Sequence, residues 1–365
     1  MKKLLAVVIL SLFLVPVCLA EGVVPVLVID SGSDFTHPLL NPLADPNQVE
    51  LNGTGGIDDS GNGYVDDIYG WNFPNNNNVL CNLDNTPPRY DDVITFMNLI
   101  GIYQQVGRDN MDPADFKLLV KLYNDKELTP WNSFTGGWAH GTHCAGVIAT
   151  DNKAPLMKAV RHLNTGEPPE KKAEEMLMNF TLMYRPGRSR TRSIDENPML
   201  PELIAYFKEM GQKGAEEIEP EAKYVGSLNP RVVNCSFGVP NEALLKSFKD
   251  YMTQQWNFTN PTDKEVQDMV NLYVTHTMLP SDKVFYSYMK DALIVFAAGN
   301  SSENYENVVT SPISVDITNK LVVAATNKDE SLADFSCYGK NIVEVAVPGV
   351  NIMSSFPNGR MGAMS

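Results

Sequence analysis

Short runs of apolar residues give this chain its clearest pattern. The first, residues 25–29, ends directly in Asp30, Ser31 and Gly32. Short apolar runs that end at polar residues or glycine are typical of strands buried on both faces of a parallel sheet. Comparable runs follow at residues 156–160, 232–235, 292–298, 321–325 and 342–347. Helical patterns separate several of them, and this alternation predicts a three-layer α/β/α fold with a mostly parallel central sheet.

Three stretches between the expected strands have the pattern of added helical material, at residues 91–127, 167–219 and 243–291. In the first of them, Val93, Phe96, Met97 and Ile100 have the spacing of one helix face. We interpret such faces as packing surfaces against the rest of the domain. A surface for a specific partner is the alternative.

The first twenty residues have the pattern of a secretory signal peptide. Lys2 and Lys3 are basic, residues 4–17 are almost wholly apolar, and small residues stand at the cleavage position before Glu21. The apolar run is too short for a spanning helix. Lipid attachment through Cys18 is the alternative. We therefore expect a secreted or periplasmic protein, with no membrane contact once residues 1–20 are removed.

Composition narrows the function classes further. The formal net charge is −15, which disfavours a nucleic-acid-binding protein and suits a soluble chain or one that binds cations. Outside the signal, the cysteines are Cys81, Cys144, Cys235 and Cys337. They are scattered without a CxxC spacing, so they indicate neither a zinc site nor a disulfide framework. Cys144 and Cys235 lie in apolar runs, and we expect both to pack as small buried residues.

Two polar residues follow expected strands. Asp30 ends the first strand, and in open α/β sheets the carboxyl ends of the strands line the ligand crevice. A helix-cap or turn aspartate is the alternative. Asn300 ends the segment Phe-Ala-Ala-Gly-Asn, and an amide held there can donate to a developing oxyanion. An ordinary Gly-Asn turn is the alternative.

His140 opens a run of small and apolar residues that predicts a buried helix. An imidazole in the first turn of that helix would project into the crevice, where it can accept a proton from a hydroxyl and return it to a leaving amine. His143 follows three residues later, and we expect it to make a structural hydrogen bond. A zinc site formed by the two histidines is disfavoured, because no glutamate follows His140 as in HExxH.

The order and contexts of these motifs resemble those of the subtilisin-like serine proteases (subtilases, peptidase family S8). The most specific motif is His-Gly-Thr-His-Cys-Ala-Gly at residues 140–146, and the resemblance extends over residues 23–40, 56–73, 138–162, 231–240 and 292–365. It implies a secreted serine endopeptidase that cuts polypeptide substrates through an acyl-enzyme. At the matching positions it implies Asp30 as the triad acid, His140 as the general base and Asn300 as the oxyanion amide.

The resemblance also implies a substrate cleft. Ser236, Phe237 and Gly238 correspond to the edge segment that pairs with an extended substrate backbone. Residues Ala297 to Gly299 correspond to part of the pocket for the residue before the cut. Main-chain pairing of this kind binds many sequences, so specificity would come from the walls of the pocket.

The acidic residues 58–67 follow the first half of a calcium-loop pattern. The oxygen donors with the appropriate spacing are Asp58, Ser60, Asn62 and Asp66. Gly63 provides the sharp turn, but Tyr69 stands where the closing glutamate belongs. Many subtilases carry a similar stretch. We expect modest Ca²⁺ binding that the chemistry does not require, with a polar Asx-turn loop as the alternative.

Two features depart from the family pattern. Subtilases usually carry a folding pro-domain, whereas here only residues 21–29 separate the signal from Asp30. The Gly-Thr-Ser-Met-Ala motif that carries the nucleophilic serine occurs nowhere in the chain, and the family's spacing places it beyond residue 365. Ser365 is disfavoured as a degenerate nucleophile. We therefore expect residues 21–365 to form a subtilase catalytic domain that is truncated and inactive as written. A non-catalytic, peptide-binding pseudoprotease is the alternative.

Overall fold

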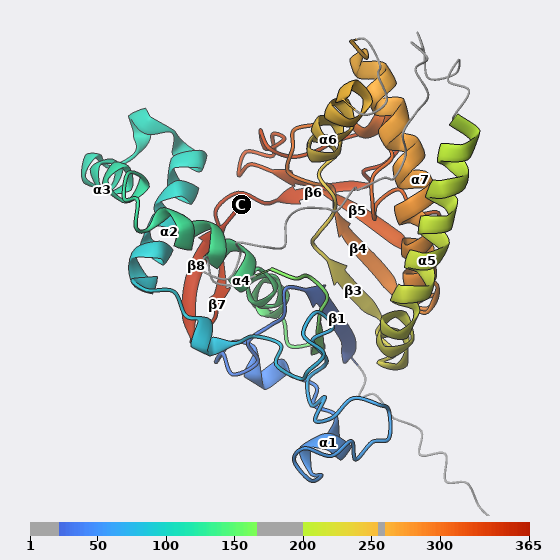
Figure 1. Ribbon diagram of the computed structural model, residues 1–365. Coiled ribbons are helices and arrows are strands. Elements are labelled where there is room, and N and C mark those ends of the chain that lie inside the picture. The colour runs from blue at the N-terminus through green and yellow to red at the C-terminus, as the bar shows by residue number, and fades with distance from the viewer. Residues whose placement is uncertain (1–21, 166–199, 255–259) are drawn as a thin grey trace, which may run out of the picture.

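A central parallel sheet organises the computed structural model, which describes residues 22–165, 200–254 and 260–365. The sheet has the strand order β2-β1-β3-β4-β5-β6, and all neighbouring strands are parallel (Figure 1). Its strands are β1 (Val24–Asp30), β2 (Pro155–Arg161), β3 (Val232–Cys235), β4 (Leu293–Ala297), β5 (Lys320–Thr326) and β6 (Val345–Pro348). Each of them overlaps one of the expected apolar runs, so the predicted fold is confirmed.

Strand β1 shows why the apolar runs are continuous. Val26 and Val28 pack on one face of the sheet, while Leu27 and Ile29 belong to the core on the other face. Because successive side chains of a strand point to opposite faces, a strand covered on both sides needs apolar residues at every position. The strand therefore carries Asp30 to its carboxyl end within the buried interior of the molecule.

Helices cover both faces of the sheet (Figure 1). Their bounds are α1 (Gln48–Leu51), α2 (Tyr90–Val106), α3 (Pro113–Tyr123), α4 (Thr129–Ala149), α5 (Leu200–Ser227), α6 (Asn241–Gln254) and α7 (Asp263–Ser287). The core on the Leu27 face includes Tyr224 of α5 and Tyr286 of α7. The core on the Val28 face includes Ala145 of α4. None of the helices in the described ranges is long and apolar enough to cross a bilayer.

The predicted helical stretches contain helices wherever the structure describes them. Helix α3 lies within 91–127 and α7 within 243–291, whereas α2 begins at Tyr90 and α6 at Asn241, just before the expected boundaries. Helix α5 extends to Ser227, beyond the expected boundary at 219. Residues 167–199 of that stretch and the signal segment 1–20 lie outside the described residues. Of the expected packing face, Val93 is fully buried in the core between α2 and α3.

A β-hairpin follows the sheet and was not predicted from the sequence. Strands β7 (Ile352–Phe356) and β8 (Arg360–Met364) pair antiparallel and pack against α4 and α2. The turn between them contains Asn358 and Gly359, both with positive φ. Asn-Gly is a strong hairpin signal, because these two residues tolerate positive φ better than others. The sequence therefore carried the signal for this hairpin.

Candidate active site

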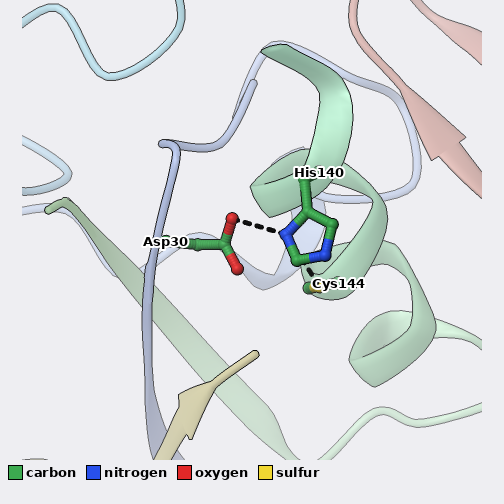
Figure 2. A group of neighbouring side chains, drawn as sticks. All are labelled: Asp30, His140 and Cys144. Atoms are coloured by element: carbon green, nitrogen blue, oxygen red, sulfur yellow. Dashed lines mark hydrogen bonds and ion pairs between the residues drawn. The ribbon is translucent and has the colours of Figure 1, made fainter. Parts of the chain in front are cut away.

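Asp30 and His140, which are 110 residues apart, are hydrogen-bonded to each other (Figure 2). Nδ1 of His140 lies 2.7 Å from Oδ1 of Asp30, and the carboxylate is fully buried. The backbone N–H of Ser31 donates to the same oxygen at 2.7 Å. Because an ionised carboxylate only accepts hydrogen bonds, Nδ1 carries the proton. This leaves Nε2 of the neutral ring as a proton acceptor, the form that a general base requires.

The surroundings of the imidazole favour its charged form. Electrostatic interactions with the Cys144 sulfur and with the Asp30 carboxylate both raise the pKa of His140 well above its ordinary value, against the opposing effect of burial. A base with a raised pKa holds an abstracted proton more readily. The pair can therefore stabilise the imidazolium that forms during proton transfer.

The position of His140 within its helix corrects the sequence analysis. Helix α4 begins at Thr129, so His140 lies in the middle of the helix and not in its first turn. Pro130 stands in the first turn, where its fixed φ and missing N–H cost nothing, and this signal was overlooked. The imidazole reaches Asp30 because α4 approaches β1 closely at Gly141. A Cβ at Gly141 would overlap the carbonyl oxygen of Gly32 and lie 3.1 Å from Cβ of Asp30.

His143 and Cys144, which lie one helical turn after His140, have different roles. Nε2 of His143 lies 2.9 Å from the carbonyl oxygen of Ile352, which is the structural hydrogen bond expected for this residue. Burial lowers the pKa of His143 to about 4, so it is neutral at pH 7. Cys144 is only partly buried, and its Sγ lies 3.9 Å from Nδ1 of His140. The expectation of a buried cysteine holds fully for Cys235, whereas Cys144 packs against the core with only part of its surface buried.

The residue spacing contained a signal for this position of Cys144. Side chains four residues apart in a helix lie on the same face, and Cys144 follows His140 by four. The apolar neighbours of Cys144 in the sequence predict a core position for it. Those neighbours, such as Ala145, face the sheet, whereas the sulfur lies on the face of His140.

A cavity of about 630 Å³ opens beside His140. The residues of the predicted cleft that line it are Ser236, Ala297, Gly299 and Asn300. Phe96, Met97 and Ile100 of α2 also line it, so part of the helix face expected to pack against the domain borders an open space. Both Asn300, which follows strand β4, and His140 therefore face one cavity that could hold a reacting bond.

Phe237 and Gly238 do not belong to the cavity lining. The Phe237 ring packs against the His162 ring, with their centroids 5.1 Å apart. His162 is itself hydrogen-bonded to Glu221 of α5, with Nδ1 2.8 Å from Oε1. Of the predicted edge segment, Ser236 therefore borders the cavity while Phe237 is held in the adjoining core.

No hydroxyl completes the pair among the described residues. The hydrogen bonds of the His140 ring in this part of the chain go to Asp30 and to the Cys144 sulfur. Ser365 borders the same cavity, but its hydroxyl accepts a hydrogen bond from the backbone N–H of Asn351 at 2.9 Å. The structure thus brings acid and base together without an attacking oxygen from the residues it describes.

The predicted calcium ligands are engaged by their own loop. Asp58 accepts hydrogen bonds from the backbone N–H groups of Gly61, Asn62 and Gly63 and from the Ser60 hydroxyl. These bonds, led by that from Gly63, lower the pKa of Asp58. Asp66 accepts from the backbone N–H of Gly56, and the Asn62 amide oxygen accepts from that of Tyr64. These oxygens therefore make the contacts of the Asx-turn alternative.

Glu50 organises the same loop and was not identified from the sequence. It is almost completely buried, and its two oxygens accept the backbone N–H groups of Ser60 and Asp66. Glu50 precedes the loop by several residues, so no spacing rule points to it. The calcium prediction stays a prediction.

Comparison with known proteins places these observations in a family. The model of the Subtilase family matches residues 22–365. The chain belongs to the subtilase family. Members of this family are serine-type endopeptidases, which matches an Asp–His pair beside a cavity.

Individual relatives align over parts of this subtilase. Subtilisin-like protease 1 of Plasmodium berghei is 37% identical over 106 residues, which are 28% of this chain and 16% of that protein. Subtilisin-like protease 6 of Trichophyton soudanense is 29% identical over 145 residues, 40% of this chain and 34% of the relative. The matched regions thus span about a third or less of either relative. A cold-adapted subtilisin-like serine proteinase of known structure is 15% identical to this chain, with a TM-score of 0.43. The match covers 94% of this chain and 70% of the chain of that proteinase.

Proposed function

We propose that this chain provides the acid, the base and the substrate cleft of an exported serine endopeptidase. Asp30 acts as the acid, His140 as the general base and Asn300 as the oxyanion donor. The observation that carries this proposal is the 2.7 Å hydrogen bond between Asp30 and Nδ1 of His140, on the border of a cavity that Asn300 also lines.

Each side chain would have a separate task during peptide-bond cleavage. Nε2 of His140 takes the proton of an attacking hydroxyl, and Asp30 stabilises the imidazolium that results. The Asn300 amide donates to the oxyanion of the tetrahedral intermediate, an interaction that typically lowers the barrier by about 2.7–4 kcal/mol. The imidazolium then returns its proton to the leaving amine. The substrate backbone would extend along Ser236, next to the pocket bordered by Ala297 and Gly299.

We further propose that residues 1–365 alone bind polypeptides without hydrolysing them. The support is that His140 makes no hydrogen bond to a hydroxyl in the described ranges, while the cavity is open. The same observation favours a second candidate, a non-catalytic peptide-binding protein. The two candidate functions make different predictions: supplying a serine hydroxyl at His140 should yield turnover in an endopeptidase and none in a non-catalytic peptide-binding protein.

One experiment tests both parts. The purified chain is incubated with an unstructured protein substrate and with a fluorophosphonate probe, and we expect neither turnover nor labelling. Labelling at Ser365 together with turnover would refute the proposed inactivity.

Fluorescence anisotropy with a labelled unstructured peptide measures binding. Ser236→Tyr should weaken binding about tenfold or more, whereas the matched change Ser247→Tyr, at an exposed position of α6, should not. Equal affinities would refute the placement of the cleft.

Export and calcium binding remain part of the proposal. Sequencing the N-terminus of the exported protein should show cleavage after Ala20, and an intact N-terminus would contradict it. For Ca²⁺, the acidic composition of residues 58–67 supports binding, although their oxygens accept hydrogen bonds from the loop. No step of the chemistry depends on this ion.

A further inference from the structure

We propose that Asp30, His140 and Cys144 bind a thiophilic divalent cation of the zinc class. One ligand atom from each residue lies within 4.8 Å of the other two. Figure 2 shows the three side chains converging, the carboxylate from the end of β1 and the imidazole and sulfur from successive turns of α4. Among the described histidine, cysteine and acidic residues, they alone form such a group.

The distances suit a tetrahedral ion after a small movement. Nδ1 of His140 lies 2.7 Å from Oδ1 of Asp30 and 3.9 Å from Sγ of Cys144. Ligands of tetrahedral zinc stand about 2.0–2.3 Å from the metal, which separates them from one another by roughly 3.3–3.8 Å. The sulfur must therefore approach slightly and the carboxylate must withdraw slightly. A set of one nitrogen, one sulfur and one oxygen donor is typical of zinc and excludes the hard cations Ca²⁺ and Mg²⁺.

An unpartnered oxygen points independently to a cation. Oδ2 of Asp30 is buried and has no hydrogen-bond partner among the described residues. A buried carboxylate oxygen without a partner is costly, and native structures rarely contain one without a functional reason. In Figure 2 this oxygen lies on the Cys144 side of the Asp30–His140 bond. A cation held by Nδ1 and Sγ would satisfy it.

The site is accessible and incomplete in the manner of an open metal site. His140 and Cys144 both line the 630 Å³ cavity, so an ion can enter and a water from the cavity can occupy the fourth position. The neighbouring His143 does not belong to this group, and its Nε2 bonds to the carbonyl oxygen of Ile352.

Binding exchanges protons for the ion. Nδ1 of His140 and the Cys144 thiol each release a proton to solvent, and the ion takes their place between the imidazole, the sulfur and the Asp30 carboxylate. With Nδ1 bound to the metal, His140 loses its hydrogen bond to Asp30 and with it the orientation that a general base needs. The proposal does not depend on the proposed function, because it concerns binding alone.

Cobalt provides a direct spectroscopic test. The full chain is reduced, treated with a chelator to remove metals, exchanged into buffer and titrated with Co²⁺. We expect a thiolate-to-cobalt charge-transfer band and visible bands of tetrahedral intensity, both abolished by Zn²⁺. Cys144→Ser should remove the charge-transfer band, and Asp30→Asn should keep it while weakening binding about tenfold. The matched control is Cys81→Ser, since Cys81 is also a partly buried free cysteine but lies outside the group.

A second measurement uses the unaltered chain and so is independent of whether the variants fold. Iodoacetamide alkylation of Cys144 and Cys81 is followed by peptide mass spectrometry with and without Zn²⁺. We expect Zn²⁺ to slow alkylation of Cys144 at least tenfold and to leave Cys81 unchanged. Absence of a charge-transfer band in the folded chain, its persistence in Cys144→Ser, or equal alkylation of Cys144 with and without Zn²⁺ would each overturn the proposal.

Discussion

Two glycines of helix α4 should respond in opposite ways to the same substitution. Gly141 and Gly136 lie five residues apart in this helix. A Cβ at Gly141 would overlap the Gly32 carbonyl oxygen and press on Cβ of Asp30, whereas a Cβ at Gly136 would meet nothing within 4 Å. Alanine is the better helix former at both positions, so only the space around each glycine distinguishes them.

The magnitudes follow from these contacts. Replacing a glycine within a helix by alanine gains about 1 kcal/mol. Overpacking costs about 1–3 kcal/mol, and the upper end applies at Gly141 because the obstacle is main chain and cannot rotate away. Gly141→Ala should therefore lower the free energy of unfolding by about 2 kcal/mol. Gly136→Ala should raise it by up to about 1 kcal/mol.

Urea unfolding followed by circular dichroism measures both changes. A second readout is the low-field proton resonance of His140 Nδ1–H, which reports the hydrogen bond to Asp30. Gly141→Ala should shift or broaden this resonance, because α4 must move away from β1. Gly136→Ala should leave it in place. Changes of the same sign in unfolding free energy would refute the claim that close approach at Gly141 positions the imidazole.

Three further outcomes are expected. The Cys144 sulfur and the Asp30 carboxylate raise the folded pKa of His140, so the charged imidazole stabilises the fold fully below the ordinary histidine pKa, and this contribution is lost as pH rises through the folded pKa. Asp30→Asn should therefore lose most stability at acidic pH, by about 1.5 kcal/mol, in melting curves across pH, and a pH-independent loss would contradict this. Against the opposing desolvation, Glu221 raises the pKa of His162, so Glu221→Gln should lower it in an NMR titration, and an unchanged value would contradict the pairing. Added Ca²⁺ should raise the melting temperature and Asp58→Asn should abolish the rise; no effect of Ca²⁺ or chelator would exclude the calcium site.

The sheet and the acid of the site could be predicted because their signals are local. A strand buried on both faces needs an unbroken apolar run, and the run ending at Asp30 is β1 almost residue for residue. Because the carboxyl ends of parallel strands lie at the same edge of the sheet, the sequence also predicts that Asp30 lies at this edge. His140 was identified through its motif, although its place in the middle of α4 was not.

The rest of the site depends on packing between distant segments. The cavity is bordered by α2 and by the end of β4, and no local pattern indicates that Phe96 and Ala297 line the same cavity. Likewise, the apolar neighbours of Cys144 indicate a buried helix face but not which residue lies at its edge. The hairpin β7–β8 is different, since Asn358-Gly359 is a local signal for its turn.

That hairpin explains why small residues occur on both sides of α4. Gly141 allows contact with the loop after β1, and on another side Gly146 faces β7, where a Cβ would overlap the hydroxyls of Ser354 and Ser355. These two serines donate to the carbonyls of His143 and Thr142 at 2.8 Å each. The helix is thereby held between β1 and β7 by contacts that only glycine permits. Because His140 directly precedes Gly141 in this helix, its imidazole is positioned by the contacts of α4 with both strands, and a side chain at either glycine would displace it from Asp30.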